Sequence, residues 1–248
     1  YEGAPTPVTA FMSTAPKVAA IALLLRALEV PFGHLGTQWT GIIVLVSIAS
    51  MLLGSLAAIG QSNIKRLMAY SSIGHMGYAL VGLAVNTEQG VRGVLIYMVT
   101  YVFMSAGVFA CIIAMRRRGR SLERISDLSG LATTDPGLAL AMTVFMFSMA
   151  GIPPFSGFFG KLYVFLPAVQ AGYWTLAVIG VLTSVVGAYY YLRVIKVMYF
   201  DKAEPAFDAR SPSVSFVAGV GALVTTLFFV FPAPLVAAAQ SAARVLFG

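Results

Sequence analysis

The sequence predicts an all-α, polytopic membrane bundle of seven transmembrane helices, one of them broken near residues 151–154. The first observation is composition: of 248 residues, 59% are hydrophobic and only 10% are charged, with a mean hydropathy of +0.87. Soluble domains are typically about 45–50% apolar and about 25% charged. The second observation is that apolar residues form long stretches, and the third is that basic residues stand in short runs between them. Despite a net charge of +7, this pattern excludes a soluble enzyme, a disordered chain and a nucleic-acid-binding module.

Seven stretches are long enough to cross a bilayer as helices. A hydrocarbon core of about 30 Å needs about 20 apolar residues at a rise of about 1.5 Å each. The qualifying stretches are residues 8–29, 40–60, 66–85, 93–115, 137–169, 173–195 and 213–238. They leave too little polar sequence to cover a soluble protein. We also expect the chain to be a fragment of a longer polypeptide, because it begins at Tyr1 without a methionine or a signal peptide.

The distribution of Lys and Arg predicts how the spans are oriented. If successive spans alternate in direction, most of the basic residues fall on one side. They lie in the loop between the second and third stretches, near residue 65, and in residues 116–136 and 196–212. Loops rich in Lys and Arg stay in the cytoplasm. The C-terminus is therefore expected on the opposite side of the membrane.

Residues 116–136 are long enough for an element of their own. Leu122, Ile125 and Leu128 recur every three residues among charged neighbours. This spacing predicts a short amphipathic helix lying along the membrane surface.

Three ionisable side chains lie far from any span end. Lys17 and His75 each come ten residues after a span boundary and Lys161 lies nine before one, roughly 15 Å deep in each case. A charge at this depth costs about 3 kcal/mol, and a lysine stem of about 6 Å is too short to reach the surface. A lone histidine could instead be a neutral imidazole bonded to a neighbouring helix. Three such groups at one depth favour a shared function, and we assign them to a proton relay.

The backbone near two of these residues is expected to be irregular. Pro16 precedes Lys17, and Pro153 and Pro154 interrupt the fifth stretch, which predicts two half-helices joined by an unwound segment. The carbonyls freed there need donors, and Ser156 or ordered water could supply them. The partial positive charge at the start of the second half-helix is expected to act against the ammonium form of Lys161.

The segment before and around His75 is rich in hydroxyl groups for an apolar helix. We assign supporting roles to Tyr70 and Ser72, which could hold water or bond to other helices, and to Lys65 at the start of the segment. The glycines of this segment are also explained by close helix packing alone.

Three motifs make the chain recognisable. Residues 2–9 (EGAPTPVT) with 15–17 (APK), residues 61–77 (QSNIKRLMAYSSIGHMG) and residues 150–161 (AGIPPFSGFFGK) resemble the eighth, tenth and broken twelfth helices of the antiporter-like membrane subunits of respiratory complex I. The motifs are co-linear, and the similarity extends over nearly the whole chain. Lysine rather than histidine at position 17, and an expected end soon after the last span without a long lateral helix, are similar to one branch of that family.

The resemblance implies the eighth to fourteenth helices of a fourteen-helix fold. Residues 8–29 would be the first span, residues 40–195 a five-helix half-channel repeat, and residues 213–238 the last span, within a single membrane domain. It further implies that Lys17 and Lys161 transfer protons along a hydrated axis with His75 nearby. The expected location is the bacterial inner membrane, with a periplasmic C-terminus and other membrane subunits of complex I as partners.

The resemblance also implies where the energy comes from. NADH, flavin, iron–sulfur clusters and quinone would act elsewhere in the complex, with no cofactor or metal in this chain, because one cysteine and two histidines offer no redox site. A cation/proton antiporter subunit or a hydrogenase-associated subunit with the same fold is the main alternative. A secondary solute transporter is disfavoured, because the sequence offers no acidic site for a substrate or sodium. A passive scaffold would leave the lysines at mid-membrane depth unexplained.

Overall fold

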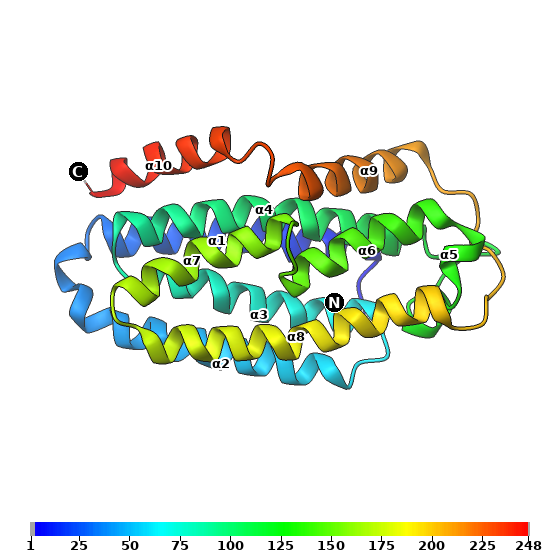
Figure 1. Ribbon diagram of the computed structural model, residues 1–248, viewed down its shortest axis with the longest axis horizontal. Helices are drawn as coiled ribbons and strands as arrows, with labels where there is room; N and C mark the ends of the chain where they lie inside the picture. Colours follow the sequence, from blue (N-terminus) through cyan, green and yellow to red (C-terminus); the bar gives the residue numbers. More distant parts are fainter. Residues whose placement is uncertain (1–2, 248) are drawn as a thin grey trace.

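The computed structural model describes residues 3–247, so Tyr1 and the first residue of the motif at 2–9, Glu2, lie outside the described residues. Between residues 3 and 247 the regular structure is helical apart from one small hairpin, and the long helices run side by side along the longest axis of the molecule (Figure 1). In chain order the elements are α1 (Thr6–Glu29), η1 (Gly33–Leu35), α2 (Gly36–Ile59), α3 (Ile64–Ala84), α4 (Glu88–Ala114), β1 (Arg116–Arg117), β2 (Arg120–Ser121), η2 (Ile125–Leu128), α5 (Leu131–Thr134), α6 (Pro136–Ala150), α7 (Ser156–Gln170), α8 (Trp174–Phe200), α9 (Pro212–Leu227) and α10 (Ala233–Phe247).

Four stretches of the described chain are long and apolar enough to cross a membrane as single helices, namely Thr6–Glu29, Gly33–Ile59, Glu88–Ala114 and Trp174–Phe200. The helices α6, α9 and α10 are apolar but shorter. The helix α3 does not qualify, because it carries two basic residues, a histidine and several hydroxyls among its apolar residues. The fold is therefore a mostly helical membrane-protein fold.

The polar helix α3 lies in the centre of the bundle. Most of its residues are buried, including Ser71, Ser72 and His75. It packs closely on α2 through small residues: a Cβ added at Gly54 would lie 2.4 Å from the backbone nitrogen of Gly74. Close approach through small residues is how membrane helices pack without a hydrophobic driving force. The sequence therefore places its polar groups inside protein rather than against lipid.

Side-chain caps fix where several helices begin. The Asn63 side chain accepts hydrogen bonds from the backbone N–H groups of Lys65 (2.8 Å) and Arg66 (3.1 Å) at the start of α3. Thr87 and Asp135 cap α4 and α6 in the same way. These caps satisfy N–H groups that have no partner within the helix.

The expected surface helix in residues 116–136 is wrong. A hairpin of β1 and β2 opens this segment, and the short elements η2 and α5 follow. Arg118 and Gly119 have positive φ angles of 53° and 75°, which suit a tight hairpin turn. The three-residue spacing marks a 3₁₀ turn, in which side chains three apart lie on one face, and Ile125 and Leu128 are buried in the core rather than facing lipid.

The fifth apolar stretch is broken, as expected. The helix α6 ends at Ala150 and α7 begins at Ser156. Figure 1 shows the two half-helices meeting near the middle of the long axis. Pro153 and Pro154 lie on the outside of this break and are exposed. Proline cannot donate a backbone hydrogen bond, so the helix cannot continue through this pair.

The last stretch, expected as one continuous helix over residues 213–238, is instead two helices. The helix α9 ends at Leu227, and α10 begins at Ala233 and continues to Phe247. Pro232 stands at the junction, and its ring would collide with the carbonyl of residue 228 in a continuous helix. Hydropathy depends on side-chain polarity and does not detect this effect of proline on the backbone. Both helices lie along α4 at one edge of the bundle (Figure 1).

Candidate proton-relay site

Lys161 lies at the centre of the candidate site because the break between α6 and α7 brings its amine back to the end of α6. The side chain is 6% exposed. Its Nζ donates to the carbonyl oxygens of Met149 (3.0 Å) and Ala150 (3.1 Å) and to the Ser184 hydroxyl on α8 (2.6 Å). An ammonium group has three donors. All three are satisfied here, and the ring of Tyr78 lies 5.0 Å from Nζ.

This geometry corrects two expectations about the break. The donors to the freed carbonyls are Lys161 and Ser184, whose Oγ lies 3.4 Å from the Ala150 carbonyl oxygen. Ser156 instead faces Ser148, with 3.4 Å between their hydroxyl oxygens. The amine also lies at the C-terminal end of α6, where the helix dipole is negative, and not at the positive start of α7. The backbone partners of the amine are therefore the last carbonyls of α6 and not the first N–H groups of α7.

Gly151 is required by this arrangement. Its φ angle is 87°, a left-handed conformation that ends α6. A Cβ at this position would lie 3.0 Å from Nζ of Lys161 and 3.1 Å from its Cδ. Glycine supplies both the conformation and the space for the lysine side chain.

His75 is held on both sides by tyrosine hydroxyls from other helices. Its Nδ1 lies 2.5 Å from the Tyr97 hydroxyl on α4, and its Nε2 lies 3.1 Å from the Tyr191 hydroxyl on α8. A neutral imidazole has one donor and one acceptor nitrogen, so one tyrosine donates to the ring and the other accepts from it. The Tyr191 hydroxyl is also 2.5 Å from the Ser71 hydroxyl. His75 can therefore receive a proton at one nitrogen and release one at the other.

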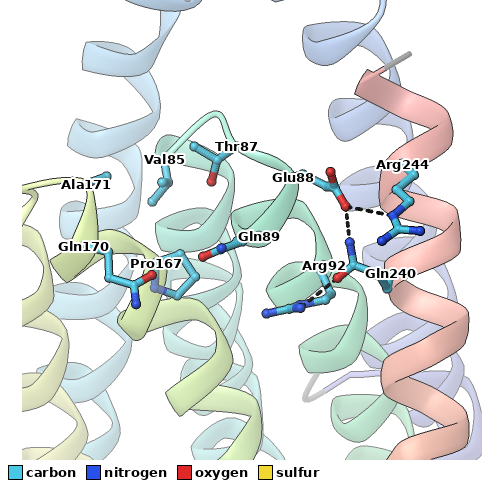
Figure 2. A pocket seen from close by; sticks show the side chains of 10 residues that line it. All are labelled: Val85, Thr87, Glu88, Gln89, Arg92, Pro167, Gln170, Ala171, Gln240 and Arg244. Atoms are coloured by element: carbon cyan, nitrogen blue, oxygen red, sulfur yellow. Dashed lines mark hydrogen bonds and ion pairs between the residues drawn. The ribbon is translucent and has the colours of Figure 1, made fainter.

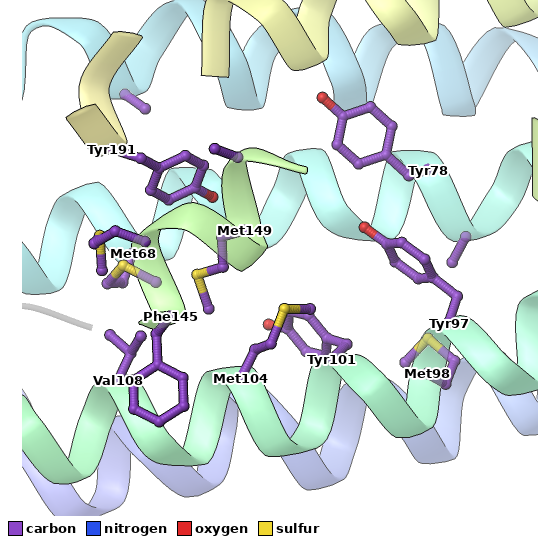
Figure 3. Packing of buried hydrophobic residues seen from close by; sticks show 14 of the residues in the cluster. Met68, Tyr78, Tyr97, Met98, Tyr101, Met104, Val108, Phe145, Met149 and Tyr191 are labelled. Carbon is purple, nitrogen blue, oxygen red and sulfur yellow. The ribbon is translucent and has the colours of Figure 1, made fainter. Parts of the chain in front are cut away.

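A small cavity joins His75 to Lys161. Its volume is about 10 Å³, near the minimum that a single water molecule needs. Its lining residues are Ser55, Ser71, Gly74, His75, Tyr78, Met149, Lys161, Gly187, Tyr190 and Tyr191. Figure 3 shows Tyr78, Tyr97 and Tyr191 among buried methionines and Phe145 of the same core. Polar hydroxyls thus meet in one place within an otherwise apolar core.

Lys17 approaches this cluster from α1 and is half-buried. One turn before Lys17, the Ser13 carbonyl oxygen lies 2.9 Å from the Tyr101 hydroxyl, which is 3.0 Å from Oγ of Ser72. The ring centroids of Tyr101 and His75 are 5.5 Å apart. The structure therefore brings the surroundings of Lys17, Ser72 and His75 together.

Lys65 and Tyr70 lie outside this cluster. Lys65 is 1% exposed, and its amine donates to Glu123 and to the Ala4 carbonyl oxygen, both at 2.8 Å. Burial raises the pKa of the Glu123 carboxyl, but hydrogen bonds from Lys65 and Asn63, with the charge of Lys65, bring it below its ordinary value. These contacts connect α3 to residues 116–128, which comprise the hairpin and η2 and are called the hairpin segment below. Tyr70 is half-buried at the edge of the core.

Sequence reasoning missed Ser184, Tyr97 and Tyr191. Ser184 follows Thr183 in the mostly apolar helix α8, and Tyr97 and Tyr101 lie four residues apart on one face of α4. That spacing is a usable signal, because residues four apart on a helix lie on the same side. The partners of these hydroxyls come from other helices and are not visible in the sequence. Among residues 3–247, no group of three or more His, Cys, Asp or Glu side chains gathers that could hold a metal ion.

The chain is similar to known membrane proteins over almost its full length. A family model described as NADH:quinone oxidoreductase/Mrp antiporter, TM, matches residues 1–187. A protein of Granulibacter bethesdensis named NADH-quinone oxidoreductase subunit N is 68% identical over 99% of this chain and 52% of its own length. A chain in the structure of respiratory complex I from Thermus thermophilus with bound aureothin is 33% identical, with a TM-score of 0.82, over 96% of this chain and 52% of that one.

A chain in the structure of the Mrp complex from Dietzia sp. is 25% identical, with a TM-score of 0.88, over 98% of this chain and 53% of that one. The described chain thus spans about half the length of the relatives it matches.

Proposed function

Because the chain belongs to the NADH:quinone oxidoreductase/Mrp antiporter family of membrane subunits, we propose that it is the C-terminal half of a proton-translocating subunit of NADH:quinone oxidoreductase. The subunit would be of the N type, the bacterial counterpart of subunit 2 of the mitochondrial enzyme. Quinone reduction elsewhere in the complex would drive proton transfer through Lys17, His75 and Lys161. The observation that carries the proposal is the placement of the buried Lys161 amine on the carbonyls of a broken helix.

The hydrogen bonds of Lys161 support a role in proton transfer. The ammonium form uses all three donors on Met149, Ala150 and Ser184. When the amine releases a proton it keeps two donors and gains a lone pair, which the Ser184 hydroxyl can meet by reversing its own hydrogen bond. The released proton would pass through water in the shared cavity to His75. The site can therefore hold either protonation state with little movement of heavy atoms.

His75 would carry the proton onward between its two tyrosines. Accepting a proton at one ring nitrogen and losing the other proton exchanges the tautomer, while Tyr97 and Tyr191 reverse their hydroxyls. Tyr101 and the half-buried Lys17 extend the polar path toward α1. The supporting roles of Ser72, Ser156, Pro153 and Pro154 are to shape this path, and Lys65 would stabilise the adjoining loop.

We further propose seven membrane crossings, numbered eight to fourteen in the full subunit. The pair α6–α7 and the pair α9–α10 would each make one crossing, and residues 40–195 would form a half-channel repeat. The basic hairpin segment would face the cytoplasm of a bacterial inner membrane, with the C-terminus in the periplasm. This chain would hold no redox centre, so NADH, flavin, iron–sulfur clusters and quinone would act in other subunits of the complex, its expected partners.

The test uses the complex carrying the full-length subunit, reconstituted into lipid vesicles, with NADH oxidation and the pH gradient measured together. Lys161→Met keeps the side-chain stem but removes the amine, so protons moved per NADH oxidised should fall. Lys17→Met should have a milder effect. Lys196→Met is the matched control, because Lys196 pairs with Asp201 and is exposed. An unchanged proton yield in Lys161→Met would refute the relay.

The likeness to a chain of an Mrp complex favours one second candidate, a subunit of a cation/proton antiporter. A membrane-bound hydrogenase subunit with the same fold belongs to the same alternative. Sodium uptake distinguishes them: vesicles that exchange sodium for protons without NADH oxidation would favour the antiporter, and a proton yield independent of sodium would favour the oxidoreductase.

A further inference from the structure

A large polar cavity lies at the end of the bundle where α4 begins and α7 and α10 end. Its volume is about 700 Å³, within the range of sites that bind small molecules. Figure 2 shows Arg92 extending toward Gln170 across the cavity, while Glu88, Gln240 and Arg244 are joined along the other wall. No residue of the proposed relay lines it.

The side chains around the cavity favour an anion. Two arginines line it, and the only carboxylate among the lining residues, Glu88, is already bound by Gln240 and by Nε of Arg244 at 3.4 Å. Arg92 donates through Nη1 to Gln240 at 2.7 Å. The cavity therefore keeps a net charge of +1 with its one acid neutralised.

Arg92 has an unsatisfied donor. Its Nε is buried and has no hydrogen-bond partner within residues 3–247. A buried donor without a partner is unfavourable, so the guanidinium gains if it turns into the cavity to meet an acceptor. The guanidinium edge that contains Nε matches a phosphate through two parallel hydrogen bonds. Phosphate is thus the chemical group that this wall fits.

The surroundings of the cavity indicate where the phosphate comes from. Leu166, one turn before Gln170, is 49% exposed, and Val245, next to Arg244, is 81% exposed. Both residues belong to helices that line the cavity, and exposed apolar side chains on such helices suit an acyl chain below a charged headgroup. We propose that this cavity binds the phosphate headgroup of an anionic phospholipid, in the leaflet on the side where α4 begins. The proposal does not depend on proton transfer.

The experiment measures lipid binding to the delipidated complex that carries the full-length subunit. Phosphatidylglycerol, phosphatidylcholine and inorganic phosphate are titrated separately, and bound ligand is counted by native mass spectrometry. Arg92→Gln should weaken phosphatidylglycerol binding at this site about tenfold, as expected for loss of a hydrogen bond to a charged group. Arg92→Lys keeps the charge but not the two parallel donors of the guanidinium, so its affinity for phosphatidylglycerol should lie between those of the unmodified protein and Arg92→Gln. Arg26→Gln removes an exposed arginine of α1 outside the cavity and should change nothing.

Each result decides the question. Equal binding of phosphatidylcholine and phosphatidylglycerol would overturn the anionic site. Inorganic phosphate binding as tightly as phosphatidylglycerol would show a free-anion site and overturn the lipid source. A loss in Arg92→Gln that Arg26→Gln matches, or that occurs only in complexes no longer eluting as the intact assembly, would also overturn it.

Discussion

The amine of Lys161 lies 3.0 Å from the carbonyl oxygen of Met149, a residue twelve positions earlier on the other half of a broken helix. The two half-helices are therefore joined by the side chain that is proposed to carry the proton. When Lys161 loses a proton in the proposed exchange, its amine keeps its bonds to Met149 and Ala150, while the Ser184 hydroxyl turns from the Ala150 carbonyl to the amine. This links the chemistry of the amine to the geometry of the break.

Gly151→Ala tests whether the close approach at the break matters. The substitution places a methyl group 3.0 Å from Nζ and forces a left-handed alanine, which costs roughly 1–2 kcal/mol. We expect intact assembly and a reduced proton yield per NADH. Gly172→Ala is the control, because Gly172 has a φ of 84° but nothing lies within 4 Å of its added Cβ. Equal effects of the two substitutions would show that strain alone is responsible.

Tyr191→Phe removes one of the two hydroxyls that hold His75. The ring would lose its Nε2 partner, and Ser71 would lose its bond as well. An unsatisfied buried polar group costs about 1–3 kcal/mol, so proton transfer should slow about tenfold. Proton uptake by vesicles after a rapid NADH pulse measures this rate. Tyr189→Phe, at an exposed position of the same helix, should match the unmodified protein; identical rates in both variants would remove Tyr191 from the relay.

The ion pair between Lys65 and Glu123 predicts a pH dependence of the hairpin segment. The pKa of Glu123 is lower in the folded protein than in the unfolded chain. Its stabilising contribution is therefore complete above the unfolded pKa and is lost as the pH falls through the folded pKa. Hydrogen exchange at the amides of Ile64 and Ile125, which bridge α3 and this segment, should accelerate on acidification beyond its intrinsic change. Glu123→Gln should abolish that dependence; a variant that retains it would place its origin elsewhere.

The proposed orientation predicts which side of the membrane single cysteines label from. With Cys111 replaced by Ser, a cysteine at Arg118 should react only from the cytoplasm, and one at His34 only from the periplasm. Arg118 lies in the hairpin turn and His34 in the 3₁₀ turn η1 at the start of the stretch Gly33–Ile59, and both are exposed. A cysteine at Asp208, in the loop after α8, would be less suitable, because the Asp208 carboxylate accepts hydrogen bonds from the N–H groups of Arg118 and Gly119 and holds the hairpin. Labelling of both cysteines from one side would contradict an odd number of crossings between them.

The sequence allowed most of the fold to be predicted, because apolar length and proline position act locally. The break at Pro153 and Pro154 follows from the missing backbone donor. The junction at Pro232 follows from the same rule, but it was not predicted because residues 213–238 form one long apolar stretch. The hairpin at Arg118 depends on contacts with Asp208, which is distant in sequence.

The candidate site could be predicted only in part. The depth of Lys161 in the membrane can be found by counting residues along the span, whereas the direction in which its amine points cannot be found from the sequence. Its partner Ser184 lies on another helix, and the field at the amine depends on which half-helix end it meets. The tyrosines that hold His75 were missed for the same reason, since α4 and α8 supply them from outside α3.

The most direct test of the account is the proton yield of Lys161→Arg in reconstituted complex. Arginine keeps a positive charge and several donors for the α6 carbonyls, but it does not release a proton under physiological conditions. If Lys161 exchanges a proton, the variant should assemble, oxidise NADH and show the same loss of proton yield as Lys161→Met. If Lys161 only caps the broken helix, Lys161→Arg should pump normally, and that result would contradict the account.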